Sequence, residues 1–248
     1  MTDLAYDDTG AGTPLVFLHG ITSRRESWTP VVDRLSAKYR CVNVDLLGHG
    51  ESPRTGAYDV FSQSAAVEGL ITDLGLDAPV LIGHSFGAFV ATLTAGTGTS
   101  RGVVNIDQEL DMAAFKTKVA PYADRLREGD FAVAFDEFTE SLGRALVPQQ
   151  NRDLTAMTAD QEVVLGVWTT VFDTPAADLN ALIEPALETI AVPYLVIFAS
   201  KISQDERRLL ELIPRVEVEE WEGMGHFLHL VDPERTTTRI SAFVDQLR

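Results

Sequence analysis

The chain has little cysteine and little positive charge, and it lacks long apolar runs. Its single cysteine, Cys41, excludes an intramolecular disulfide. Its 248 residues include 20 Lys and Arg against 37 Asp and Glu, a formal net charge of −17. This acidic balance argues against nucleic acid and anionic membrane surfaces as partners. No apolar run reaches the length of a membrane span and no signal-peptide pattern opens the chain, so we expect a cytoplasmic protein.

Motifs for cofactors and metals are also missing. No metal-ligand spacing occurs, and the glycine-threonine repeat at residues 96–99 lacks the surroundings of a phosphate-binding loop. We therefore expect no cofactor and no metal. The sequence does not indicate an oligomeric state.

Apolar, strand-like runs alternate with helix-like segments. Hydrophobic residues make up 45% of the chain, enough for one sizeable core. Most of the runs are continuously apolar, which is typical of strands covered on both faces. The alternation predicts an α/β fold with a mostly parallel central sheet flanked by helices. Strands are expected near residues 4–6 and at 15–18, 41–46, 80–82, 103–106, 194–198 and 216–221, and helices at 28–37, 60–74, 86–95, 205–212 and 233–247.

One long segment breaks this alternation. Between the strands expected at 103–106 and 194–198 the chain contains only helix-like stretches, although a crossover needs about a dozen residues. We interpret residues 109–187 as an inserted helical cap, or lid, on a core formed by 1–108 and 188–248. The aromatic residues of the segment fit the cap's own small core better than they fit ligand contact. The cap helices are expected at 112–127, 131–146, 160–172 and 177–187.

The most informative motif is Gly83-His84-Ser85-Phe86-Gly87, a Gly-x-Ser-x-Gly pattern between an expected strand and an expected helix. In that context the serine lies on a sharp turn that lifts its hydroxyl out of the sheet. The pattern therefore predicts Ser85 as a nucleophile. The alternative is a serine that merely caps an ordinary helix.

A serine nucleophile needs a general base, usually a histidine. Among five histidines, His226 lies in a glycine-rich loop after the last expected strand, at the sheet edge where sites of parallel α/β proteins form. We assign His226 as the base. His229 is the alternative, although packing or capping suits it better.

Four motifs follow one another along the chain. They are Leu18-His19-Gly20-Ile21, Asp45-Leu46-Leu47-Gly48-His49-Gly50-Glu51-Ser52, Gly83-His84-Ser85-Phe86-Gly87 and Gly225-His226-Phe227. In this order they resemble the α/β-hydrolase superfamily over nearly the whole chain, which implies that fold and a serine-nucleophile enzyme with a helical cap. Such motifs are specific for the fold and poorly specific for the substrate. The resemblance also implies that an edge strand at the N-terminus is absent.

The resemblance implies an oxyanion hole formed by the backbone N–H groups of Ile21 and Phe86. The side chain of His19 is expected to hold this loop by hydrogen bonds. The stretch from Asp45 to Ser52 is interpreted as architectural, with Asp45 accepting from nearby backbone N–H groups. Arg24 and Arg25 suit solvated or salt-bridged positions better than a substrate carboxylate.

The acid of the triad is less clear. Many members of the superfamily carry it after the strand that follows the cap, but there this chain has Ile202 and Ser203. Others carry it at the end of the strand before the cap, and there this chain has Asp107. We assign Asp107, which gives the chain order Ser, Asp, His of the fold. Asp205 and Glu109 stay open as alternatives.

These residues predict a serine hydrolase that acts on small-molecule esters or thioesters. Alternatives that use the same triad are a C–C bond hydrolase of the ring-cleavage type and a perhydrolase or haloperoxidase-like enzyme. A ligand sensor with very slow turnover is a further alternative. The sequence does not define the acyl group, the alcohol or the stereoselectivity.

Overall fold

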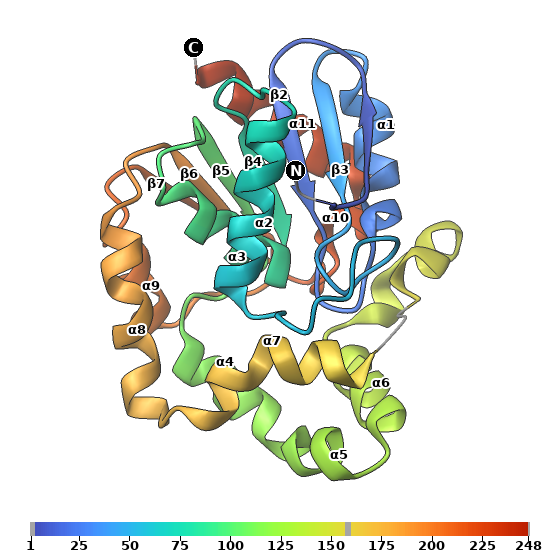
Figure 1. The fold of residues 1–248 in the computed structure, drawn as a ribbon, viewed down its shortest axis with the longest axis vertical. Helices are drawn as coiled ribbons and strands as arrows, with labels where there is room; N and C mark the ends of the chain where they lie inside the picture. The colour runs from blue at the N-terminus through green and yellow to red at the C-terminus, as the bar shows by residue number, and fades with distance from the viewer. Residues whose placement is uncertain (1–2, 157–159, 248) are drawn as a thin grey trace.

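The computed structural model describes residues 3–156 and 160–247, so residues 157–159 of the expected cap lie outside the described residues, as do Met1 and Thr2. A seven-stranded sheet with the order β1-β3-β2-β4-β5-β6-β7 forms its centre (Figure 1). All neighbouring strands are parallel except β1 and β3. The mostly parallel α/β sheet is therefore confirmed. The strands are β1 Tyr6–Thr9, β2 Pro14–Leu18, β3 Arg40–Val44, β4 Val80–His84, β5 Gly102–Ile106, β6 Tyr194–Phe198 and β7 Val216–Glu220.

Alternate residues of the central strands pack against opposite helical layers. Val104 and Ile106 of β5 belong to the core on one face, whereas Val103 belongs to the core on the other. Every residue of β4, β5 and β6 is buried, which explains their continuously apolar sequences. Helices α1 (Thr29–Leu35) and α11 (Pro233–Gln246) cover the first face, and α2 (Val60–Asp73), α3 (Phe86–Ala95) and α9 (Gln204–Leu210) cover the second.

The edge strands differ from the central ones. All four residues of β1 are exposed, and β7 alternates Val and Glu before its final Glu220. The first strand was expected near residues 4–6 but runs over Tyr6–Thr9. An exposed strand pairs through its backbone, so its side chains carry no apolar signal.

The segment between β5 and β6 is helical throughout its elements and gathers at one end of the sheet (Figure 1). The expected helix at 112–127 is interrupted by a 3₁₀ turn, Ala120–Tyr122, which contains Pro121. Phe115, Phe135 and Phe138 each contact the ring of Trp168, with centroids 5.5–5.7 Å apart. The helices are α4 Met112–Val119, α5 Ala123–Glu128, α6 Phe131–Ser141, α7 Gln161–Asp173 and α8 Ala176–Glu188, with 3₁₀ turns at Arg144–Leu146 and Gln149–Thr155.

Two short elements escaped the sequence analysis. The 3₁₀ helix η1 (Arg25–Trp28) precedes α1, and α10 (Leu228–Val231) precedes α11. Within the described residues, no helix is both long enough and apolar enough to cross a membrane.

Candidate active site

Ser85 occupies a strained turn between β4 and α3. Its backbone has φ 51° and ψ −130°, a region that non-glycine residues rarely enter. A Cβ on Gly83 would lie 2.3 Å from Ala88, and one on Gly87 would lie 2.3 Å from the carbonyl oxygen of Leu18. Only glycine therefore fits on either side of the serine. Ser85 stands at the N-cap position of α3, but its side chain makes no capping hydrogen bond, so the helix-cap interpretation fails.

Asp107 stands at the carboxyl end of the neighbouring strand β5. It too has a positive φ, 56°. Its N–H donates to the carbonyl of Ile197, and its carboxylate accepts from the N–H of Ala199 at 2.7 Å. The second carboxylate oxygen lies 2.7 Å from Nδ1 of His226. Residues 119 positions apart in the chain thus meet at this edge of the sheet.

His226 is held by its backbone on both sides. Its N–H donates to the carbonyl of Leu142 between α6 and the next 3₁₀ turn, and its carbonyl lies 2.9 Å from Nε2 of His84. Gly225 has φ 66°, and a Cβ there would lie 2.9 Å from Leu146. When Asp107 accepts from Nδ1, the neutral ring keeps its unprotonated nitrogen at Nε2. In that tautomer Nε2 is the ring nitrogen that can accept a proton.

The loop after β2 approaches the serine closely. A Cβ on Gly20 would lie 3.3 Å from Cβ of Ser85, so the backbone beside Ile21 runs against the turn. Two buried histidines hold this loop. Nε2 of His19 accepts from the N–H of Leu46 at 3.1 Å, and Nε2 of His49 accepts from the N–H of Thr22 at 3.0 Å. Burial lowers the pKa of His19, and it lowers the pKa of His49 to about 3, so both rings are neutral acceptors near neutral pH.

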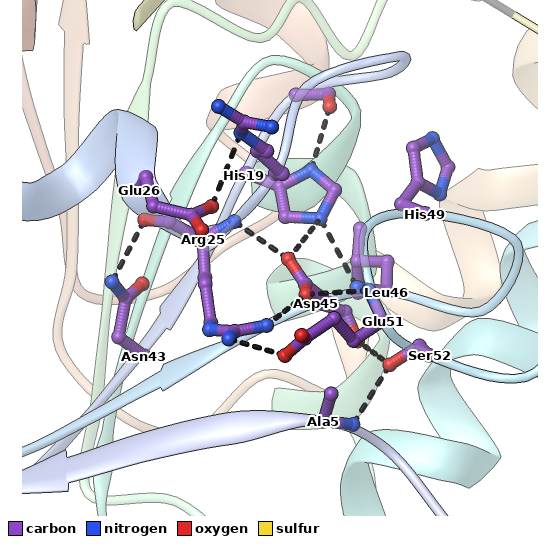
Figure 2. A network of polar contacts seen from close by, with 12 residues as sticks. Ala5, His19, Arg25, Glu26, Asn43, Asp45, Leu46, His49, Glu51 and Ser52 are labelled. Atoms are coloured by element: carbon purple, nitrogen blue, oxygen red, sulfur yellow. Dashed lines mark hydrogen bonds and ion pairs between the residues drawn. The ribbon is translucent and has the colours of Figure 1, made fainter. Parts of the chain in front are cut away.

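Asp45 holds the loop after β2 through hydrogen bonds and an ion pair to Arg25 (Figure 2). Its fully buried carboxylate accepts from the N–H groups of Arg25 and Glu51 and pairs with the Arg25 guanidinium. Arg25 also pairs with Asp7 at 3.0 Å and with Glu51 at 2.6 Å. The expected backbone contacts of Asp45 are confirmed. Arg25 is committed to this network, and Arg24 pairs with Glu26.

The alternative site residues have other surroundings. The ring of His229 is buried against those of Trp28 and His84, with centroids 4.5 and 4.4 Å away, and burial lowers its pKa to about 3. Asp205 is exposed in the first turn of α9. Glu109 forms an ion pair with Lys118. The carboxylate hydrogen-bonded to the His226 ring is that of Asp107.

Two buried polar residues near the site were missed in the sequence. Glu206 accepts from the N–H groups of Leu110 and Asp111, where the chain leaves β5 for α4. Asn105 makes hydrogen bonds around the Asp107 turn. A carboxylate in a first helical turn and an amide in a strand are both common, so neither had a distinguishing sequence signal.

A cavity of about 520 Å³ joins these elements. Ser85, His226, Asp107, Ile21 and Phe86 all line it. Its remaining wall comes largely from α3 and the helices between β5 and β6, and it is mostly apolar; examples are Phe89, Leu93, Phe115, Trp168, Val171 and Ile183. Among residues 3–156 and 160–247, no group of three or more His, Cys, Asp or Glu could hold a metal ion.

Comparison with known proteins gives consistent matches. A model described as "Alpha/beta hydrolase family" matches residues 15–239. The putative non-heme bromoperoxidase BpoC of Mycobacterium tuberculosis is 28% identical over 269 residues, covering 98% of this chain and 98% of the relative. The 2-(acetamidomethylene)succinate hydrolase of Mesorhizobium japonicum is 36% identical over 104 residues, covering 40% of this chain and 37% of the relative.

Among solved structures, a thermophilic esterase from Thermogutta terrifontis, determined with malate bound, superposes with a TM-score of 0.75 at 23% identity. The superposition covers 98% of this chain and 93% of the esterase. Similarity at this level of identity concerns the fold, and fold alone does not define a substrate.

Proposed function

The chain belongs to the alpha/beta hydrolase family, and we propose that it is a serine hydrolase that cleaves carboxylic esters or thioesters through an acyl-enzyme on Ser85. Its fold is the α/β-hydrolase fold expected from the sequence. The observation that carries the proposal is the 2.7 Å contact between Asp107 and Nδ1 of His226. This contact lies in the cavity that the strained Ser85 also lines.

In this mechanism the Ser85 hydroxyl attacks the acyl carbon while Nε2 of His226 takes its proton. Asp107 orients the imidazole and stabilises its charged form. The N–H groups of Ile21 and Phe86 bind the oxyanion, an interaction worth about 100- to 1000-fold in rate for each donor. His226 then passes the proton to the leaving alcohol or thiol. Water attacks the acyl-enzyme with His226 again as the base, which releases the acid and restores the serine.

We propose residues 109–187 as a cap over this site, with residues 1–108 and 188–248 as the core. Support comes from the cavity wall, because α4, α7 and α8 contribute apolar side chains opposite α3. The backbone contact from His226 to Leu142 ties the base loop to this segment. A cap of this kind limits which small molecules reach the serine.

The test is turnover of excess p-nitrophenyl acetate together with labelling by a fluorophosphonate probe. We expect steady turnover far beyond one equivalent, and loss of both turnover and labelling in Ser85→Ala. A burst that stalls after one equivalent indicates a slow sensor instead. Absence of labelling in the wild-type protein contradicts the nucleophile assignment altogether.

The relative named as a bromoperoxidase, which matches along the whole chain, favours perhydrolysis as the second candidate. There hydrogen peroxide replaces water, so the acyl-enzyme yields a peracid and the serine hydroxyl is restored. Measuring peracid formed from an ester and hydrogen peroxide, against acid formed in water, separates the two activities. If the protein is a C–C bond hydrolase instead, it should turn over a diketone of the kind that ring cleavage produces.

A further inference from the structure

The charges around the cavity bear on which substrates it can take. Of the described residues that line the cavity, Lys118 is the only Lys or Arg. Its ammonium forms an ion pair with Glu109, which lines the same cavity. The other lining carboxylate, Asp107, bonds to His226. The described residues of the cavity wall therefore present no uncommitted lysine or arginine.

Two further histidines of the wall, His84 and His229, do not supply a cation either. Burial lowers the pKa of His84 well below its ordinary value of 6.5 and that of His229 to about 3. Both rings are thus neutral at neutral pH. A substrate carboxylate in this cavity would lose its hydration without gaining a paired cation, which is costly.

The position of the ion pair within the cavity matters as well. The side chains of Lys118 and Glu109 are 53% and 31% exposed, so they lie at the mouth rather than among the buried apolar residues. The apolar part of the wall includes Phe89 and Leu93 of α3 together with the buried Trp168 and Ile183. Such a wall suits an aliphatic or aromatic group, because removing apolar groups from water favours binding.

We propose that the Glu109–Lys118 ion pair determines specificity, closing the cavity to carboxylate-bearing substrates and leaving it for uncharged, apolar acyl groups. The inference rests on the proposed function of Ser85 as an acyl-transfer nucleophile. Glu109 acts by occupying the one cation that a carboxylate would need and by adding a negative charge beside it.

The test compares two methyl esters of closely similar size, methyl 6-methylheptanoate and monomethyl adipate. For the wild-type protein we expect kcat/KM to favour the uncharged ester by about 100-fold. Glu109→Gln frees Lys118, and it should narrow that preference by about tenfold. Glu137→Gln is the matched control: Glu137 pairs with Arg125 in the same helical segment but does not line the cavity. It should leave the preference unchanged.

Equal turnover of the two esters by the wild-type protein overturns the proposal, as does an unchanged preference in Glu109→Gln. Binding separates this failure from failure of the proposed function. Calorimetry on Ser85→Ala with the amides 6-methylheptanamide and adipamate needs no catalysis. Tighter binding of the uncharged amide supports the selectivity whether or not esters are cleaved, and equal binding contradicts it.

A separate observation concerns how Asp107 is held. Asn105 is fully buried, and its side-chain amide spans the Asp107 turn. Its Oδ1 accepts from the N–H of Gln108 and its Nδ2 donates to the carbonyl of Gln108, both at 2.9 Å. The amide therefore clamps both backbone groups of the residue that follows the strained Asp107.

The same amide starts a chain of hydrogen bonds toward the nucleophile. Its Nδ2 donates to the Tyr194 oxygen at 3.0 Å, and that oxygen lies 2.7 Å from Oγ1 of Thr92. Thr92 in turn donates to the carbonyl of Ala88, in the first turn of the helix that follows Ser85. All three side chains are buried, and these partners give each hydroxyl one bond to donate and one to accept.

The geometry points to Asn105 as a positioning residue that holds the Asp107 carboxylate in register with His226, supported by Tyr194 and Thr92. This also rests on the proposed function. Asn105→Leu keeps the size and removes the three bonds. We expect kcat to fall about 100-fold with little change in KM. The acid limb of the kcat/KM pH profile should move to lower pH, since a displaced carboxylate stabilises the imidazolium less.

Gentler variants keep the inference testable when Asn105→Leu folds poorly. Tyr194→Phe and Thr92→Val each remove the two hydrogen bonds of one hydroxyl but leave the Asn105 amide in place, and each should lower kcat about three- to tenfold. Thr94→Val is the matched control, because Thr94 is a buried threonine on the same helix that bonds Ser64 and Val90 instead. Wild-type kcat in Tyr194→Phe and Thr92→Val, in a protein that Asp107→Asn inactivates, overturns the positioning role. An inert Asp107→Asn shows instead that the acid assignment is wrong.

Discussion

At the scale of single residues, the surroundings rather than the residue type give each histidine its role. His19 and His49 are buried and neutral; His19 accepts a hydrogen bond from the N–H of Leu46, and His49 accepts one from the N–H of Thr22, so both hold the loop beside Ile21. His84 and His229 pack ring against ring. His226 is the one of the five with a carboxylate hydrogen-bonded to its ring among the described residues. A carboxylate partner suits a ring that gains a proton during the reaction.

The first prediction belongs to this scale and concerns Asp107. Asp107→Asn should lower kcat about 10,000-fold with the fold intact, because an amide no longer stabilises the imidazolium or the correct tautomer. Asp205→Asn is the control, since Asp205 is exposed on α9 and should tolerate the change. Steady-state kinetics with circular dichroism checks both variants. If instead Asp205→Asn lowers kcat and Asp107→Asn does not, the acid of the triad is Asp205 on α9.

At the scale of elements, the sequence predicted most accurately the strands that are buried on both faces of the sheet and the helices that follow clear local signals. The strand at Tyr194–Phe198 and the helix at Phe86–Ala95 occur where they were expected, because apolar continuity and the glycine-flanked turn are local signals. The exposed strand Tyr6–Thr9 was misplaced because its pairing uses only the backbone. The short helix Leu228–Val231 was missed because its apolar residues merge with those of the loop before it.

The candidate site divides in the same way. Ser85, His226 and Asp107 could be proposed from sequence because each follows a strand that ends at the same edge. Glu206 and Asn105 could not, because their roles depend on what tertiary packing places beside them. Burial of Glu206 beneath the first residues of the cap segment, for example, is set by a contact across 96 positions of the chain.

Glu206 supports a prediction about the element that it holds. Burial raises the pKa of Glu206 from its ordinary value of 4.5 to about 7. The folded state therefore binds more protons than the unfolded state between these values, so stability falls as pH rises through this window. The whole effect is about 3 kcal/mol at pH values above both pKa values. Glu206→Gln lacks this titration.

The measurement is urea unfolding of the wild-type protein and Glu206→Gln from pH 5 to pH 8. The free energy of unfolding of the wild-type protein relative to the variant should decrease with rising pH. The comparison cancels the titration of groups that both proteins share. A difference that stays constant over this range shows that the carboxylate is ionised throughout, held by the N–H groups of Leu110 and Asp111.

At the scale of the whole molecule, the charge of −17 acts on any substrate before the cavity does. A potential of this sign concentrates cations near the surface and depletes anions, and salt screens it over about 10 Å at 0.1 M. The field thus works in the same direction as the Glu109–Lys118 ion pair. The field of the whole protein acts over a longer range than the ion pair. Salt therefore screens the field more easily than it screens the contact between Glu109 and Lys118.

This difference gives a prediction that a matched pair of esters can check. Heptanoylcholine and 3,3-dimethylbutyl heptanoate have nearly the same shape, but only the choline ester is cationic. Raising the ionic strength from about 0.01 M to about 0.3 M should lower kcat/KM for the choline ester about tenfold, because screening removes its enrichment near the acidic surface. For the neutral ester kcat/KM should change less than about twofold, since it has no charge for the field to act on. An equal response of the two esters would mean that salt acts on the protein's conformation, and the long-range field would then have no part in substrate choice.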